Sequence, residues 1–333
     1  MSLTRLTITL LALVLAACSA TPSAAPSAAS QELRHVTLLL GFRPDVQFAP
    51  FYVAQQDGYY ADAGLEVTIE HKQAPDVQRL VADGQAEFGV ADATDVMIAR
   101  TSGIPVTYVS TLYEQFPVAI IGRKGKVPSN PSGLAGKKIG TPGKFGSSWH
   151  ALLALLSAGG LRESDVTIRE YPQFNQADGL AKGDVDLITG FRNNEPLRLE
   201  AQRIPVDLLT IDQIAPLPGP GTIVGQALLD HDPDLVRRFA QATVRAQQAV
   251  IDKPDLGLQA AKVAVPTLAD DLKTAGAVLQ ATTTLWAGEG AFTGGKIDVA
   301  RWRQAYGIMK KLGFIDGSVP VEQMIAPSIL SGA

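Results

Sequence analysis

The sequence predicts an α/β protein built of two lobes. Short apolar runs alternate with helical patterns from residue 35 to about 112, which is typical of a mostly parallel sheet with helices on both faces. A second alternation of strands and helices runs from about 118 to 215. The roughly 300 residues from position 35 onward exceed what one hydrophobic core usually serves, so two cores are expected.

The first alternation supplies the elements of the first lobe. The run 35–40 (HVTLLL) is apolar and β-branched, as a buried strand should be, and the pattern breaks at Gly41. The helical segments end at or near glycines, which commonly terminate helices. We expect strands at 35–40, 66–72, 87–91 and 106–112, and helices at 49–63, 76–82 and 94–101.

The pattern changes near Tyr113, and the second lobe is expected from about residue 118. Its expected strands are 117–123, 137–141, 166–171, 185–189 and 206–211, with a helix at 149–158. After the Pro/Gly-rich stretch 216–221 come helices expected at 233–251, 256–265, 269–286 and 299–312, which should pack back on the first lobe. The predicted lobe 1 is therefore 35–117 with 216–333, and lobe 2 is 118–215.

The N-terminus has the form of a secretory signal. Arg5 precedes an apolar run over 6–17 that is too short for an ordinary transmembrane helix of about 20 residues. Its ending, Leu15-Ala16-Ala17-Cys18, resembles the bacterial lipobox, so we expect cleavage of 1–17 and acylation of Cys18. An ordinary signal with a chance cysteine is the alternative. Residues 18–34, rich in Ser, Ala and Pro, are interpreted as the acylated cysteine with a disordered spacer, which would hold the body outside the cytoplasm by a lipid anchor alone.

Composition argues against several classes of function. Of 29 Lys and Arg, loss of Arg5 leaves 28 against 33 acidic residues, and no dense basic cluster indicates nucleic-acid binding. The four histidines are scattered without metal-ligand spacing. Acylation of Cys18, the single cysteine, leaves no thiol for a disulfide or a nucleophile. We expect no metal, no cofactor, no catalytic residue and a monomeric protein.

Candidate ligand-binding residues follow predicted strands, because ligands of open α/β sheets meet the carboxyl ends of the strands. Core packing is an equal alternative for Phe51 and Trp149, as is helix capping for Asp92 and Thr94, and plain loop chemistry is an alternative for 193–195. The candidates are Phe42, Asp45, Gln47, Phe48 and Phe51 in the first loop, Asp92 and Thr94 in the second, Tyr113 at the crossover, Phe145, Gly146, Ser147, Ser148 and Trp149 in the third loop, and Asn193, Asn194 and Glu195 in the fourth.

Several separated motifs, in order over 35–225, carry a family resemblance. They are 41–54 (GFRPDVQFAPFYVA), 57–60 (DGYY), 63–67 (AGLEV), 83–91 (DGQAEFGVA), 134–140 (LAGKKIG), 182–186 (KGDVD) and 193–196 (NNEP). With them the chain resembles the NMT1/THI5-like solute-binding proteins of bacterial ABC transporters. The resemblance implies a type II periplasmic-binding-protein fold, in which two α/β lobes close on a ligand in the cleft between them.

Within that family, Phe48, the loop 145–148 and the segment 193–196 look most like the bacterial flavin or pyrimidine binders. The eukaryotic enzymes of this fold make the thiamine pyrimidine with a cysteine-rich iron motif, which a chain whose only cysteine is Cys18 lacks. The resemblance therefore implies import rather than synthesis, with an ABC permease and ATPase as partners.

The candidate residues themselves suit a flat, neutral heterocycle. Aromatic faces would stack on a ring, and a few amides and carboxylates would fix its orientation. Only Arg43, Lys144 and Arg192 lie near the loops, so an anionic ligand such as a sulfonate is second choice. We expect riboflavin, with a thiamine pyrimidine precursor of the hydroxymethylpyrimidine type as the alternative and a pyrimidine-synthesising or releasing enzyme as a second alternative.

Overall fold

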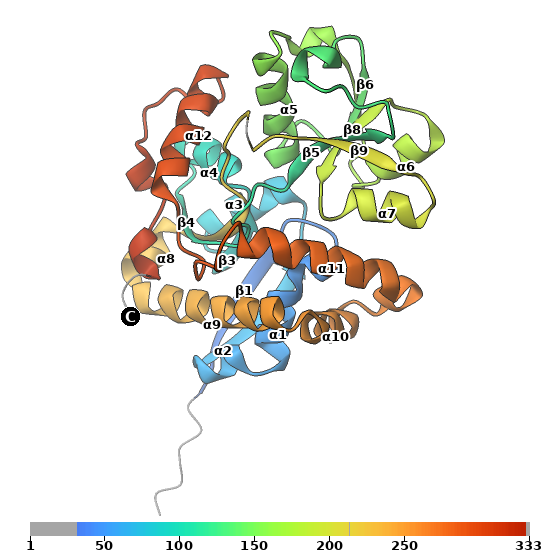
Figure 1. The fold of residues 1–333 in the computed structure, drawn as a ribbon. Helices are drawn as coiled ribbons and strands as arrows, with labels where there is room; N and C mark the ends of the chain where they lie inside the picture. The colour runs from blue at the N-terminus through green and yellow to red at the C-terminus, as the bar shows by residue number, and fades with distance from the viewer. Residues whose placement is uncertain (1–31, 213, 331–333) are drawn as a thin grey trace, which may run out of the picture. The chain divides into compact units, whose positions relative to one another are not determined.

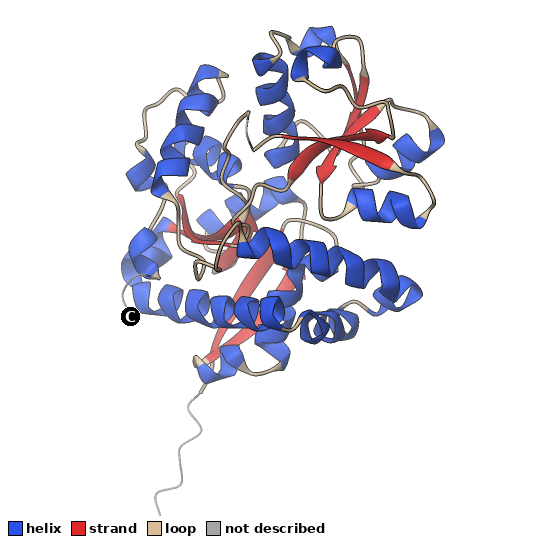
Figure 2. Ribbon diagram, viewed as in Figure 1, coloured by secondary structure: helices blue, strands red, loops and turns tan. Residues whose placement is uncertain are grey.

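Two five-stranded sheets organise the computed structural model, which describes residues 32–212 and 214–330 (Figures 1 and 2). The first sheet has the order β2-β1-β3-β10-β4, and the second has the order β7-β6-β8-β5-β9. The predicted signal 1–17, Cys18 and the spacer as far as residue 31 lie outside the described residues. No helix of the described part is long and apolar enough to cross a membrane.

The first sheet carries the chain's first four strands and one late strand. In it, β1 pairs in parallel with β2 from Arg34 opposite Leu65 to Leu40 opposite His71. The strands are β1 (Arg34–Leu40), β2 (Leu65–His71), β3 (Phe88–Ala91), β4 (Val106–Thr111) and β10 (Gly221–Gly225). Its helices are α1 (Ala49–Gln56), α2 (Tyr59–Asp62), α3 (Ala74–Ala82), α4 (Ala93–Thr101), α8 (Gln226–His231), α9 (Pro233–Asp252), α10 (Pro254–Ala264), α11 (Leu272–Ala287) and α12 (Val299–Lys311).

The second sheet is built from the middle of the chain. The chain reaches it after β4 and leaves it after β9, so two crossovers join the lobes. The strands are β5 (Val118–Arg123), β6 (Lys138–Thr141), β7 (Thr167–Glu170), β8 (Leu187–Phe191) and β9 (Val206–Thr210). The helices are α5 (Gly146–Ala158), α6 (Gln176–Lys182) and α7 (Glu195–Ala201).

Four of the five strands in each sheet run in one direction, so the prediction of a mostly parallel sheet is confirmed, and one strand of each sheet runs the other way. The strands β5 and β10 are the first after each crossover, and both run antiparallel to their two neighbours. Sequence pattern missed β10, because its five residues begin and end with glycine. A Cβ on Gly221 would clash with the Ser110 carbonyl oxygen, so the close approach to β4 requires glycine there.

Two helix boundaries also differ from the prediction. The helix expected at 49–63 is broken into α1 and α2 by Gly58, whose φ of +79° is left-handed. Helix α5 begins at Gly146, three residues before the expected start at Trp149, because Phe145 has extended backbone and ends the preceding loop. This shift places Ser147 and Ser148 in the first turn of a helix rather than in a loop.

The helices of the C-terminal third contribute to the core of the first lobe. Helices α9 and α10 pack against α1, as expected. The Phe239 ring of α9 stacks on Phe88 of β3 at 3.8 Å and on Tyr60 at 5.2 Å between ring centroids. Trp286 and Trp302 are buried packing residues on C-terminal helices. A second apolar cluster extends from Val96 of α4 to Leu152 of α5 and so joins the two lobes.

Candidate functional site

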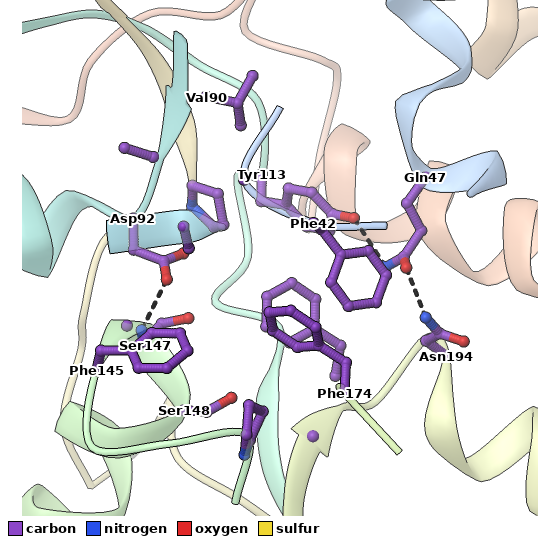
Figure 3. A pocket seen from close by; sticks show the side chains of 18 of the residues that line it. Phe42, Gln47, Val90, Asp92, Tyr113, Phe145, Ser147, Ser148, Phe174 and Asn194 are labelled. Atoms are coloured by element: carbon purple, nitrogen blue, oxygen red, sulfur yellow. Dashed lines mark hydrogen bonds between the residues drawn. The ribbon is translucent and has the colours of Figure 1, made fainter. Parts of the chain in front are cut away.

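A pocket of about 130 Å³ lies where loops of both lobes meet (Figure 3). Its wall comes from the loop after β1, the start of α4, both crossovers, the first turn of α5, the loop after β7 and the start of α7. Loops at the carboxyl ends of strands therefore form it, as sheet topology predicts. The lining residues are Gly41, Phe42, Gln47, Phe48, Ala74, Val90, Ala91, Asp92, Leu112, Tyr113, Pro142, Phe145, Gly146, Ser147, Ser148, Phe174, Gln176, Gly190, Phe191, Asn194, Glu195 and Pro220.

Aromatic rings of the two lobes meet in the middle of this pocket. Phe42 of the first lobe lies edge-on to Phe174 of the second, with ring centroids 4.8 Å apart. The ring centroids of Phe145 and Phe174 are 6.4 Å apart, and those of Phe191 and Tyr113 are 6.0 Å apart. Edge-to-face contacts of this kind contribute on the order of 1 kcal/mol each beyond area burial. The rings provide apolar faces for a flat ligand.

Neutral amides form one end of the pocket, which we name the amide end (Gln47, Tyr113 and Asn194). The Gln47 amide donates to the Tyr113 hydroxyl at 3.2 Å and accepts from the Asn194 amide of the second lobe at 2.6 Å. Arg198 continues this network, because it donates to Asn194 Oδ1 at 2.5 Å and to Asp45 Oδ2 at 2.7 Å. Burial raises the pKa of Tyr113, so its hydroxyl keeps its proton.

A carboxylate crosses between the lobes at the opposite end, which we name the carboxylate end (Asp92 and Ser147). Asp92 stands at the N-cap of α4 but makes no side-chain bond to its own helix. Its Oδ2 instead accepts the backbone N–H of Ser147, in the first turn of α5, at 2.7 Å. Burial raises the pKa of the Asp92 carboxyl, and hydrogen bonds from Ser147 oppose that shift.

Two further titratable groups stand behind the carboxylate end. Burial and the charge of Asp92 raise the pKa of Asp95. His150 of α5 has Nδ1 2.9 Å from the Thr94 hydroxyl and 3.5 Å from Asp95 Oδ1. Burial lowers the pKa of His150 to about 4, so the ring is neutral at pH 7 and its contact with Asp95 is not an ion pair.

Glu195 adds a second carboxylate to the wall, held by protein donors. Its Oε2 accepts the Phe191 N–H at 2.8 Å, and its Oε1 accepts the Gln176 amide at 3.1 Å. Burial raises the pKa of Glu195. Gln176 also donates to the Thr189 carbonyl at 3.3 Å, so its nitrogen faces two acceptors and its Oε1 is left without a partner among the described residues.

The three cations near the predicted loops lie outside the pocket wall. Lys144 pairs with Glu163 at 2.6 Å, and Arg192 pairs with Asp212 at 3.1 Å. Arg43 lies over the Phe42 ring, 5.4 Å from its centroid. None of the described residues that line the pocket is Lys or Arg, so the wall offers rings, amides, hydroxyls and two carboxyls.

Comparison with known proteins identifies the family of this chain. The profile of the NMT1/THI5-like family matches residues 45–256. The chain belongs to the NMT1/THI5-like family. It is 34% identical over 338 residues to the riboflavin-binding protein RibY of Chloroflexus aurantiacus, covering 97% of this chain and 96% of that protein.

Enzymes and sulfonate binders are also among the similar proteins. The chain is 31% identical over 237 residues to the 4-amino-5-hydroxymethyl-2-methylpyrimidine phosphate synthase of Legionella pneumophila, covering 68% of this chain and 73% of that enzyme. The solved alkanesulfonate-binding protein SsuA of Xanthomonas axonopodis pv. citri, bound to MOPS, superposes with a TM-score of 0.70 at 14% identity, covering 89% and 99% of the two chains. The predicted fold of two α/β lobes is confirmed.

Most of the candidate residues of this family member converge on this one pocket. Eleven of the sixteen predicted ligand-binding positions belong to its wall. The capping alternative for Asp92 does not hold, because its carboxylate bonds across to the other lobe. The eleven are Phe42, Gln47, Phe48, Asp92, Tyr113, Phe145, Gly146, Ser147, Ser148, Asn194 and Glu195.

Five candidates lie behind the wall and support it. Phe51 is fully buried in the first core, and Trp149 packs in the cluster that joins the lobes. Asp45 pairs with Arg198, and Thr94 bonds His150. Asn193 donates to the Thr282 hydroxyl of α11 at 2.7 Å, a further bond between the lobes.

Sequence reasoning overlooked the loop after β7, which supplies Phe174 and Gln176. The rule that selected the other loops applies equally to this one, since it also follows a parallel strand. Phe174 has a φ of +54°, which is unusual for a residue with a side chain. That conformation presents its ring to Phe42 and Phe145, and a strained residue in a binding site is a recognised signature of function.

Proposed function

We propose that this protein is the solute-binding lipoprotein of an ABC importer, which captures a flat aromatic vitamin between its lobes and delivers it to a membrane permease. The observation that carries the proposal is a pocket completed by both lobes. The contacts Phe42–Phe174, Gln47–Asn194 and Asp92–Ser147 all cross the pocket. A ligand can enter only when they separate, and their return encloses it, which is hinge closure.

Riboflavin is the ligand we favour. Rings from both lobes offer faces to its tricyclic system, and amides offer both donors and acceptors to its uracil-like edge. A wall without Lys or Arg among its described residues supports a neutral ligand over a sulfonate. The relative RibY, similar over 97% of this chain, is named for riboflavin binding.

A thiamine pyrimidine precursor is the second candidate ligand. The carboxyls of Asp92 and Glu195 would accept hydrogen bonds from an aminopyrimidine. The family also contains pyrimidine phosphate synthases. We propose that this chain binds without turnover, because its one cysteine precedes the body and cannot supply a cysteine-rich motif.

A titration of the purified mature protein tests the ligand. Riboflavin fluorescence should fall as the vitamin stacks on the pocket's rings, and calorimetry should give one site. Hydroxymethylpyrimidine is the parallel probe, and hours of incubation should return either compound intact. Clear heat with hydroxymethylpyrimidine but no riboflavin quenching at micromolar protein would move the assignment to the second candidate. Conversion that scales with protein concentration would indicate an enzyme.

The lipid anchor is tested separately. A fatty-acid analogue supplied to cells should label the wild-type protein and leave Cys18→Ser unlabelled. Equal labelling of both proteins would contradict acylation at Cys18. A monomer that docks on the permease remains part of the proposal, and co-purification with permease and ATPase subunits would test it.

A further inference from the structure

We propose that Asp92 makes the pocket selective for uncharged ligands, because its carboxylate already occupies the amino end of α5, where an anionic group would otherwise bind. The inference rests on the proposed function, in that the pocket between the lobes holds a solute. It adds that phosphorylated or sulfonated forms of the solute are rejected.

The amino end of α5 has the properties of an anion site. The helix is 13 residues long, and its first residues, Gly146, Ser147 and Ser148, all line the pocket. The first N–H groups of a helix have no partner inside the helix, and the helix dipole favours negative charge there. Phe145 at the N-cap supplies no side-chain acceptor.

The first lobe fills this position with its own carboxylate. Asp92 Oδ2 accepts the Ser147 N–H at 2.7 Å, as Figure 3 shows. A Cβ built on Gly146 would lie 3.0 Å from Asp92 Oδ2 and 3.8 Å from Asp95 Oδ2. Two carboxyl groups therefore lie against the first turn of α5, and Asp95 accepts a bond from the Gly146 backbone.

The orientation of the Asp92 side chain is not explained by capping of α4. The residue is at the N-cap of α4, where an Asp usually bonds its own helix, yet no such bond forms. Its partner is in the other lobe and lines the same pocket. The side chain thus serves the closed pocket rather than the helix that carries it.

A second anion at this end would face repulsion without compensation. It would compete for donors already in use and would lie beside Asp92, while no Lys or Arg belongs to the described wall. Like charges placed together at a binding site strongly disfavour binding. Discrimination of about a hundredfold against an anionic analogue is therefore expected.

Riboflavin and riboflavin 5′-phosphate provide the test, since they differ by one phosphate. Calorimetry should show that the full-length mature wild type binds riboflavin about a hundredfold more tightly than the phosphate. In Asp92→Ala, and in Asp92→Ala/Asp95→Asn, the ratio should fall at least about tenfold. Asp232→Ala is the matched control, because Asp232 caps α9 through Leu235 N–H at 3.0 Å and stands in another helix.

A probe independent of flavin separates this inference from the choice of vitamin. Sodium methanesulfonate, compared with sodium chloride at equal ionic strength, should raise the melting temperature of Asp92→Ala/Asp95→Asn and leave the wild type unchanged. Failure of riboflavin to bind, together with this selective rise, would overturn the vitamin and support the inference. An unchanged flavin ratio in both variants, or equal anion response in wild type and double variant, would overturn the inference.

Discussion

The two ends of the pocket join the same two lobes with different chemistry. At the amide end, Gln47 and Asn194 share a neutral bond that continues to Tyr113 in the crossover. At the carboxylate end, an Asp carboxylate meets the backbone of a helix. Amides can donate or accept, so the first end can orient a ligand, whereas we propose that the carboxyl group at the second end repels anions. In the proposed function, one closure motion therefore combines recognition at one end with exclusion at the other.

The first prediction concerns the carboxylate end and the pH dependence of the free energy of unfolding. It has the largest expected effect. His150 stands behind the carboxylate end, and burial lowers its pKa to about 4 from an ordinary 6.5. The folded state thus binds fewer protons than the unfolded state, so this stabilisation is complete above pH 6.5 and is lost as the pH falls toward 4. The loss amounts to at most about 3 kcal/mol.

Urea unfolding of wild type and His150→Gln between pH 7.5 and pH 4 measures this effect. The raised pKa values of Asp92, Asp95 and Glu195 act in the opposite sense, because their folded forms bind more protons. The difference in the free energy of unfolding between wild type and His150→Gln, followed over pH, therefore reports the contribution of His150 alone. Parallel pH curves for wild type and variant would show that His150 carries no such linkage.

The second prediction concerns Arg198, whose side chain supports the amide end from behind. Arg198→Met removes the partner of Asp45, whose side chain is 2% exposed, and the donor to Asn194 Oδ1. The Arg198 side chain is itself 29% exposed, which reduces the cost of losing the pair. Riboflavin affinity should fall about 10- to 150-fold. Calorimetry should show partial recovery in Asp45→Asn/Arg198→Met, and a double variant weaker than the single one would argue against this pairing.

The third prediction removes the bond between the lobes at the amide end. Asn194→Ala leaves Gln47 Oε1 without the donor that lies 2.6 Å away. A buried amide without its partner costs about 1–3 kcal/mol, so riboflavin should bind roughly 5- to 150-fold more weakly. Asn130→Ala, at an exposed position of the second lobe, is the control and should bind as the wild type does. Equal affinities in all three proteins would remove Asn194 from the site.

The smallest predicted effect concerns Gln176, a lining residue that belongs to neither end. Its Oε1 has no partner among the described residues, and a ligand N–H is the donor that would satisfy it. Gln176→Leu should weaken riboflavin binding about fivefold, since one neutral hydrogen bond is worth about 1 kcal/mol. Calorimetry at pH 7 measures the change. Unchanged or tighter binding would mean that the ligand does not reach this oxygen.

Local pattern predicted most of the fold and part of the site. Apolar strands such as β1 and amphipathic helices such as α9 are visible because their own residues determine them. The strand β10 cannot be recognised from its own residues. Its antiparallel direction arises because the chain returns from the other lobe, and Gly221 is required because β10 approaches Ser110 closely. Helix α1 ends before the pattern does, because Gly58 adopts a left-handed conformation.

The site shows the same division between local and tertiary determinants. Phe42 and Asn194 were found because each follows a strand. The loop with Phe174 was overlooked although the same rule covers it, and its φ of +54° cannot be seen in sequence. The partner of Asp92 was beyond sequence reasoning, since capping describes only its own helix and Ser147 lies 55 residues away.

A distance measurement between the lobes with and without riboflavin tests the account most directly. The body contains no cysteine, so Cys18→Ser with Lys72→Cys and Gln173→Cys, both exposed and one in each lobe, accepts two spin labels specifically. We predict that saturating riboflavin shortens and narrows the distance distribution, as rings and polar pairs close on the ligand. A distribution unchanged by riboflavin, in a sample where calorimetry proves binding, would contradict capture between the lobes.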